Sequence, residues 1–375
     1  VALRDEAVAA LPWMIATLPL ALITSVLNGA LEGRSKFIVI NGLQVTGTVF
    51  FQIVPLLVAY RYSPSLSYVI PAAVLTRAFM NIPVFVACIY CVRLSSFPGI
   101  SVPAIKSLLA YGGWVAVSGI IGPIVDTVDR LLIGIILGAQ AVTYYTVPYQ
   151  LVTKARVIPG SLSRVLFQRF SADNSTNADK LAFRSLLVLL VVMTPVVVCG
   201  ILLLKPLMTL WIGKDLAVIM APLGMIILVG VWFNSLAQIP CFLMMGKGRP
   251  DIVSKLHLLE IGPFLLILWF AMKYWGVYGA AWAWTIRALV DNVLLIKISG
   301  MAKDCLSIMV SPTIILTGAL VVANFVSDES LIWRLGLFFL FMTWIWVWIK
   351  RQDDGIISKI VFFRKAASHD SISIN

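Results

Sequence analysis

The stretch LSYVIPAAVLTRAFMNIPVFVACIYC, residues 66–91, is an apolar run with one charged side chain, Arg77, near its middle. As an α-helix, a run of this length can cross the hydrocarbon core of a bilayer, which is about 30 Å thick. Arg77 would then lie at mid-membrane depth, where burying a charge costs between about 3 and about 15 kcal/mol. A cost of this size indicates that the arginine has a partner or a ligand inside the membrane.

The composition extends this prediction to the whole chain. Of its 375 residues, 60% are hydrophobic and 12% are charged, and the mean hydropathy is +0.97. Soluble domains contain about 25% charged residues, so we expect an all-α polytopic membrane protein. Apolar runs of spanning length recur eleven times and predict about eleven transmembrane helices. They cover residues 9–30, 37–60, 66–91, 107–137, 140–166, 183–204, 216–245, 252–272, 276–296, 306–327 and 331–349.

The net charge of +12 is explained by topology without nucleic-acid binding, because Lys and Arg collect in the cytoplasmic loops of membrane proteins. If the C-terminal tail is cytoplasmic, the tail and the loops on its side contain twenty basic residues, Lys154 and Arg156 among them. The opposite side contains six. This imbalance predicts a cytoplasmic C-terminus. Eleven spans then place Val1 outside, so an odd number of helices is expected to precede it.

A short internal repeat connects the two halves of the chain. The segments LTRAFMN at 75–81 and TIRALVD at 285–291 both contain Arg-Ala, two apolar residues and then Asn81 or Asp291. The two arginines, Arg77 and Arg287, are 210 positions apart, and a Gly-Arg pair recurs after 215 positions. Such offsets fit two six-helix lobes in the same orientation, which enclose a central cavity at their interface. Both arginines are then candidate ligands for an anion in that cavity.

The repeat predicts four parts along the chain. Residues 1–103 would be an incomplete first lobe that contains its last three helices, and residues 104–300 would be the complete, pseudo-symmetric second lobe. Residues 301–349 would form two additional transmembrane helices, and residues 350–375 a basic cytoplasmic tail.

Two acidic residues of the second lobe are candidates for ion coupling, because carboxyl groups inside membrane helices usually mark ion or proton pathways. Glu260 follows His257 by one turn, and Asp291 follows Arg287 by one turn. Each has a structural alternative. Glu260 could form a hydrogen bond between helices, and Asp291 is spaced to pair with Arg287 within one helix.

Asp126, Asp129 and Arg130 lie together in the outer part of another expected span. A transport role would make Asp126 or Asp129 a cation or proton site. The structural alternative is that an acidic residue pairs with Arg130 and clamps the end of the helix.

The longest recognisable motif surrounds these residues: DTVDRLLIGIILGAQAVTYYTVPYQLVTKARVIPGSLSRVLFQRFS, residues 126–171. It resembles the signature of Wzx-type polysaccharide biosynthesis flippases, including O-antigen flippases, which belong to the multidrug/oligosaccharidyl-lipid/polysaccharide exporter superfamily. The segment NGALEGRSKF, residues 28–37, is similar to the family's connection between its fourth and fifth spans. Gln168 departs from the pattern at a position where relatives often have proline.

The resemblance implies a parent protein of about fourteen helices, three of which would precede Val1. It implies ion-coupled, alternating-access translocation of oligosaccharide units on undecaprenyl diphosphate, from the inner to the outer leaflet of the bacterial cytoplasmic membrane. Implied partners are the lipid bilayer, the polysaccharide polymerase and the chain-length regulator. A proton or sodium gradient would drive transport, and no metal, other cofactor or nucleic acid is expected.

In this interpretation Arg77 and Arg287 would hold the diphosphate, because guanidinium groups match phosphate oxygens in a bidentate manner. Asn81 and Tyr145 are further candidate substrate contacts. One alternative is a multidrug antiporter of the same superfamily, in whose cavity carboxylates should outnumber arginines. The other is a glycan polymerase or ligase in the membrane, which would usually carry a large extramembrane loop. The longest loop expected here, residues 167–182, is short and basic, so a transporter is favoured over an enzyme.

Overall fold

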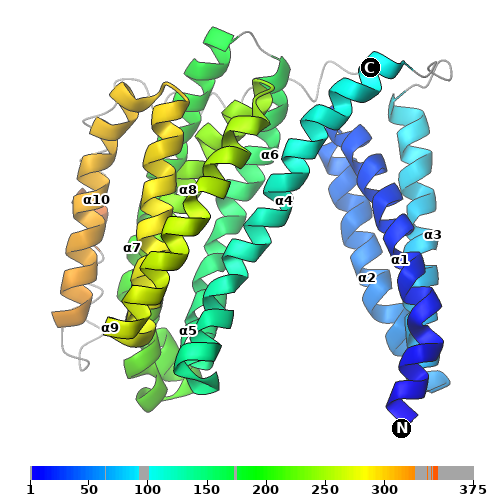
Figure 1. The fold of residues 1–375 in the computed structure, drawn as a ribbon, viewed down its shortest axis with the longest axis horizontal. Helices are drawn as coiled ribbons and strands as arrows, with labels where there is room; N and C mark the ends of the chain where they lie inside the picture. The colour runs from blue at the N-terminus through cyan, green and yellow to red at the C-terminus, as the bar shows by residue number, and fades with distance from the viewer. Residues whose placement is uncertain are drawn as a thin grey trace. The chain divides into compact units, whose positions relative to one another are not determined.

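The computed structural model describes residues 2–63, 65–92, 101–172 and 175–325, with a few residues between 336 and 344. Every regular element in these ranges is a helix (Figure 1). The chain divides into two compact units, Val1–Ser101 and Val102–Asn375, called unit 1 and unit 2 below. Their assignment as an incomplete first repeat and a complete second repeat stays a prediction.

Unit 1 contains three long helices, α1 (Ala2–Gly33), α2 (Phe37–Arg61) and α3 (Leu66–Val92). Both α1 and α2 pack mainly against α3. Their small shared core consists of Leu31, Ile40, Val84 and Cys88. Most other apolar side chains of these helices are exposed. This is expected of helices that face lipid, because hydrocarbon tails are as apolar as these side chains and no hydrophobic free energy is gained by burying them inside the protein.

Unit 2 contains the remaining described helices, which pack into one bundle (Figure 1). In chain order these are α4 (Val102–Leu137), α5 (Ala139–Thr153), the 3₁₀ turn η1 (Lys154–Arg156), α6 (Val157–Ala172), α7 (Ser175–Ile212), α8 (Lys214–Gly246), α9 (Pro250–Ile298) and α10 (Ala302–Phe325).

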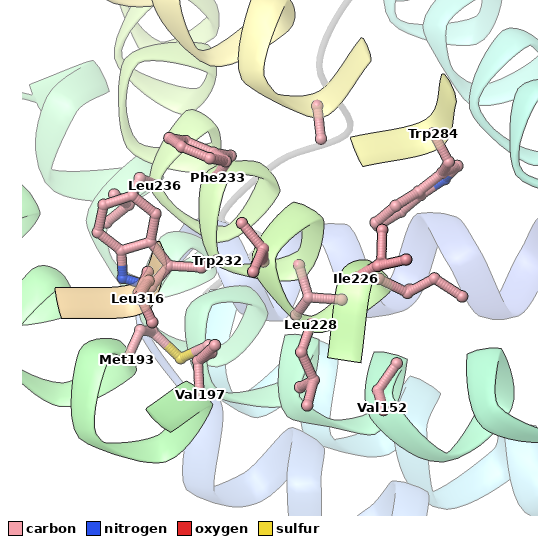
Figure 2. Packing of buried hydrophobic residues seen from close by; sticks show 14 of the residues in the cluster. Val152, Met193, Val197, Ile226, Leu228, Trp232, Phe233, Leu236, Trp284 and Leu316 are labelled. Atoms are coloured by element: carbon pink, nitrogen blue, oxygen red, sulfur yellow. The ribbon is translucent and has the colours of Figure 1, made fainter. Parts of the chain in front are cut away.

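The helix α8 forms the centre of unit 2, where it packs against α5, α6, α7 and α9. Its residues from 223 to 233 are all buried, and a helix that is apolar all round is expected in such a position. Figure 2 shows Trp232 of α8 beside Met193 of α7 and Leu316 of α10. The Trp232 indole N–H donates to the Thr194 hydroxyl at 3.1 Å, so the one polar atom of this ring is satisfied in the core.

The element α9 consists of two helices that meet at Gly276, where the backbone has φ 56° and ψ −137°. This positive φ suits glycine, which has no Cβ to clash. The chain reverses direction at this glycine. Gly279, just after the turn, lies so close to the Ala271 carbonyl that a Cβ at position 279 would lie 2.0 Å from the oxygen. The expected spans 252–272 and 276–296 therefore form the two arms of a hairpin (Figure 1).

Six described helices are long and apolar enough to cross a membrane, by length and composition. They are Ala10–Gly33, Phe37–Arg61, Leu66–Cys91, Asn177–Ile212, Lys214–Gly246 and Pro250–Ile298, the last of which contains both arms of the hairpin. Within the expected span 140–166, the short 3₁₀ turn η1 separates α5 from α6. The expected span 331–349 falls almost wholly outside the described residues, and the tail 350–375 falls entirely outside them.

Candidate functional site

Unit 2 contains a cavity of about 190 Å³ that is enclosed by α4, η1, α8 and both arms of α9. Its lining includes four of the residues that the sequence singled out: Asp126, Glu260, Arg287 and Asp291. These residues come from positions as far apart as 126 and 291, so only the packing of α4 against α9 brings them together.

The two arms of α9 present their polar residues on facing sides. On the first arm, His257, Glu260 and Phe264 follow one another at helical spacing along one face. On the second arm, Arg287 and Asp291 lie one turn apart. The arms are antiparallel. The Arg287 guanidinium therefore lies over the Phe264 ring, 5.3 Å from its centroid, while Asp291 lies opposite His257.

Two contacts between oppositely charged residues border the cavity. Arg156 Nη1 lies 3.2 Å from Asp126 Oδ2 and joins η1 to α4, with both side chains about one third exposed. His257 Nε2 lies 3.5 Å from Asp291 Oδ1, and the Asp291 side chain is almost fully buried. The second contact is an ion pair only when the imidazole carries a proton.

Four polar atoms of the cavity residues are buried and have no hydrogen-bond partner among the described residues. Three belong to charged residues, Glu260 Oε1, Arg287 Nε and Asp291 Oδ1, and a fourth is the Asn234 amide oxygen, Oδ1. Leaving a buried polar group unpaired is costly, and such groups in native structures usually answer to a function or to a bound molecule. The cavity is therefore suited to bind a polar ligand.

The structure does not form the intrahelical pair that was the alternative role of Arg287. Within the described part of the chain, no ion pair joins Arg287 to Asp291; the guanidinium lies over Phe264, and Asp291 faces His257. The Arg287 guanidinium therefore has no acidic partner among the described residues.

An apolar groove of about 180 Å³ runs along the seam between the two arms of α9. Apart from Glu260 and Arg287, its lining is apolar and includes Leu259, Phe264 and Ile286. Glu260 and Arg287 border both the groove and the polar cavity. Glu260 and Arg287, which each have a buried polar atom without a hydrogen-bond partner among the described residues, thus lie where the polar cavity meets the apolar groove.

Two other candidates, Asp129 and Tyr145, are fully buried away from this cavity. The Tyr145 hydroxyl donates to Asp129 Oδ2 at 2.7 Å, and the backbone N–H of Arg130 donates to Asp129 Oδ1. The Arg130 guanidinium lies 4.1 Å from the centroid of the Tyr149 ring, which stacks on Tyr145. These contacts hold α4 against α5, so the clamp anticipated for Asp129 and Arg130 is made through the tyrosines.

Unit 1 contains its own cavity, of about 420 Å³, and Arg77 and Asn81 both line it. The Asn81 side chain accepts a hydrogen bond from Thr24 at 2.7 Å. Arg77 is exposed, and within the described residues its guanidinium has no hydrogen bond or ion pair. The remaining polar lining consists of amides and hydroxyls (Thr24, Asn28, Gln44 and Thr48), with no carboxyl group.

Comparison with known proteins shows the family of the chain. Residues 4–221, more than half of the chain, match the family described as "Polysaccharide biosynthesis protein". The chain belongs to this family. Over 285 residues it is 28% identical to the "Putative O-antigen transporter" of Shigella flexneri, a match that covers 74% of this chain and 66% of that protein. The chain thus spans slightly less than two thirds of that relative's length. No solved structure matches the chain.

For this polysaccharide biosynthesis protein, sequence reasoning missed one charged residue of the cavity lining, Arg156. It was counted among the basic residues of a cytoplasmic loop, although it lies within the run 140–166 that was expected to span the membrane. The structure places it in η1, paired with Asp126. The signal that could have found it was the presence of Lys154 and Arg156 inside an apolar run, where a charge needs a partner.

Proposed function

We propose that the protein moves a lipid-linked oligosaccharide across the membrane in which it is embedded, as a secondary transporter of the polysaccharide biosynthesis family. Family membership supports this role, and so does the similarity to a protein named as an O-antigen transporter. The observation that carries the proposal furthest is the junction at Glu260 and Arg287, where the polar cavity meets the apolar groove. A molecule with an anionic head and a hydrocarbon tail fits such a junction.

The proposed substrate is an oligosaccharide on undecaprenyl diphosphate, carried from the inner to the outer leaflet of the bacterial cytoplasmic membrane. Its diphosphate is a compact anion, and guanidinium forks bind phosphate oxygens with charge-assisted, bidentate hydrogen bonds. Arg287 in unit 2 and Arg77 in unit 1 each lack an acidic partner among the described residues, so both can supply such a fork. The neutral amides and hydroxyls around Arg77 are suited to sugar hydroxyls or phosphate oxygens.

Transport is proposed to follow alternating access of two helical lobes, with the C-terminus in the cytoplasm and with energy from a proton or sodium gradient. Glu260, Asp291 and Asp126 are the proposed coupling residues, since all three carboxyl groups border the same cavity. The polysaccharide polymerase and the chain-length regulator are proposed partners. No chemical transformation of the substrate is part of the proposal.

One observation favours a second candidate, an antiporter for cationic drugs. Three carboxyl groups and two arginines line the cavity of unit 2, and an excess of carboxylates is what a cation carrier requires. The cavity of unit 1 has the opposite composition, with Arg77 and no carboxyl group. Because an anion carrier explains Arg77 and Arg287, which have no acidic partner among the described residues, and a cation carrier explains neither of them, we place the flippase first.

A deletion of the full-length gene in its host separates the two candidates. We expect loss of the surface polysaccharide, accumulation of undecaprenyl-linked oligosaccharide in the membrane, and recovery of both when the gene is returned. Unchanged surface polysaccharide together with new sensitivity to cationic drugs would contradict the flippase and support the antiporter.

A further inference from the structure

The cavity of unit 1 contains more polar side chains than the binding of an anion by Arg77 explains. Its volume of about 420 Å³ falls in the range of about 300–1,000 Å³ that is typical of pockets for small molecules. The polar members of its lining are Thr24, Asn28, Gln44, Thr48, Arg77 and Asn81. They come from α1, α2 and α3, which are long and apolar enough to cross a membrane. Polar groups at such depth are costly and usually functional.

Three of these side chains form hydrogen bonds within unit 1. The Thr24 hydroxyl donates to the Asn81 side-chain oxygen at 2.7 Å, and the Asn81 amide nitrogen donates to the Leu20 carbonyl at 3.5 Å. The Thr48 hydroxyl donates to the backbone carbonyl of Gln44 at 2.8 Å. The contacts of Thr24 and Asn81 join α1 to α3 and so form part of the cavity wall.

The other three polar side chains are uncommitted. Within the part of the chain that the structure describes, the Asn28 and Gln44 amides and the Arg77 guanidinium have no hydrogen-bond partner. Each comes from a different helix, α1, α2 and α3 in turn. On α2, Phe51 lines the same cavity two turns after Gln44, about 10 Å further along one helix face. Two amides, a cation and an aromatic ring therefore share one cavity.

This set of groups favours a sugar over other ligands. An amide donates through its NH₂ and accepts through its carbonyl oxygen. The oxygens of an ionised phosphate only accept, so a phosphate leaves the amide carbonyls unpaired, and a hydrocarbon chain leaves both ends unpaired. A sugar hydroxyl donates and accepts, and the C–H face of a sugar ring can pack on the apolar face of Phe51.

We propose that the cavity of unit 1 binds sugar rings of the transported molecule, and that Asn28, Gln44 and Phe51 determine which oligosaccharide is carried. The inference rests on the proposed function and deepens it, because it assigns the sugars to these three residues and an anionic group of the same molecule to Arg77. A site that hydrogen-bonds a hydroxyl strongly rejects an analogue that lacks this hydroxyl. The two amides can therefore select among sugars that differ in a single hydroxyl group.

The test measures binding of oligosaccharides, cut by acid from the surface polysaccharide of the host, to the purified full-length protein in nanodiscs. These fragments carry neither lipid nor diphosphate, so their binding reports the sugar site, and inorganic pyrophosphate is the second probe. Gln44→Leu should weaken fragment binding by about tenfold, and its combination with Asn28→Leu by about 100-fold, because each amide loses hydrogen bonds to hydroxyl groups. Pyrophosphate binding should stay as in the wild type.

Gly47 allows the cavity to be filled without loss of a polar group. It lines the cavity, and a Cβ at this position meets only Met80, at 3.8 Å, which is an ordinary contact. Gly47→Leu should therefore fold and lose fragment binding, because its side chain occupies part of the cavity. Gly42→Leu and Gln52→Leu are the matched controls and should bind as the wild type. Both positions are exposed on α2 and lie outside the cavity lining.

The proposal is wrong if the fragments show no saturable binding to the wild type, or if Gln44→Leu and Gly47→Leu bind them normally. An equal loss of pyrophosphate binding in the double variant would also overturn it, since the amides would then bind phosphate. If the double variant is poorly folded, Gly47→Leu decides the question. The gene deletion tests the flippase separately: accumulation of lipid-linked oligosaccharide without fragment binding would refute this inference and leave the proposed function intact.

Discussion

At the scale of single residues, burial decides which polar groups serve structure and which are free to bind. Asp129 and Tyr145 are both fully buried and satisfy each other at 2.7 Å. Arg287 and Glu260 line an open cavity and keep buried atoms without partners among the described residues. Both pairs are polar residues within apolar runs, and only the second pair lies where a ligand can reach it.

The first prediction concerns Tyr145. Removing its hydroxyl in Tyr145→Phe leaves the buried Asp129 with one fewer donor, which should cost about 1–3 kcal/mol of stability. The matched control is Tyr144→Phe, whose hydroxyl accepts a hydrogen bond from Gln140 at an exposed position, where water can replace it. Thermal unfolding of the purified proteins in detergent checks both. A lower midpoint for Tyr144→Phe than for Tyr145→Phe would contradict the structural role of Tyr145.

The second prediction concerns the guanidinium of Arg287. Arg287→Gln removes a charge-assisted hydrogen bond worth about 1.5–3 kcal/mol, so transport should fall by about 10- to 100-fold. Arg287→Lys keeps the charge but loses the planar guanidinium fork, so transport by this variant should fall by a smaller factor. The measurement is recovery of surface polysaccharide in the deletion strain at equal membrane levels, with the exposed Arg61→Gln as control. Full recovery by Arg287→Gln would remove this residue from the site.

Sequence patterns identified most of the charged residues that line the cavity of unit 2. Arg287 and Asp291 came from the internal repeat, Glu260 from a carboxyl group inside an apolar run, and Asp126 from the conspicuous acidic motif. The sequence could not tell which of these residues share a cavity, because their helices are joined only by packing. Asp129 and Tyr145 illustrate the same difficulty. An Asp and a Tyr that bind each other in the core cannot be told from an Asp and a Tyr that bind a substrate by residue type alone.

At the scale of elements, the hairpin of α9 positions the site. Its turn at Gly276 brings Glu260 of the first arm and Arg287 of the second arm into the lining of one cavity. The sequence predicted the two spans and the break between them, since an apolar run, a short polar break and a second run recur there. It did not predict the 3₁₀ turn η1 within residues 140–166. The average hydrophobicity of that run is high despite the two basic residues Lys154 and Arg156, so the run resembles one continuous span.

The third prediction tests this hairpin. A Cβ at position 279 would lie 2.0 Å from the Ala271 carbonyl oxygen, and backbone atoms cannot move aside as a side chain can. Gly279→Ala should therefore destabilise the protein by more than about 3 kcal/mol and reduce its level in the membrane. At Gly262, in the first arm, a Cβ meets nothing within 4 Å, so Gly262→Ala should be neutral or stabilising by up to about 1 kcal/mol. Equal thermal midpoints for the two variants would contradict the close approach of the arms.

At the scale of the whole molecule, two cavities with different chemistry occupy two separate units. Unit 1 offers Arg77 with amides and hydroxyls, and unit 2 offers arginines, carboxyl groups and an imidazole. In each unit the arginine and the residue four positions later both line the cavity, as Arg77 with Asn81 and Arg287 with Asp291 do. That the two units are repeats of one six-helix lobe stays a prediction.

The fourth prediction follows from this division. If unit 1 binds an anionic group without exchanging protons, Arg77→Gln should lower transport by about tenfold or more without changing its dependence on pH. Glu260→Gln should change the pH dependence instead. Transport rates of both variants across a pH series check this, and a changed pH profile for Arg77→Gln at unchanged maximal rate would contradict it.

The central claim is that the protein carries a lipid-linked oligosaccharide across the bilayer through a site that contains Arg287. The most direct measurement reconstitutes the full-length gene product into vesicles with fluorescent undecaprenyl-diphosphate-linked oligosaccharide and follows how much of it reaches the opposite leaflet. We predict transfer at a rate far above that of protein-free vesicles, and a loss of about 10- to 100-fold in Arg287→Gln. Transfer no faster than in protein-free vesicles, or equal transfer by wild type and Arg287→Gln, would contradict the claim.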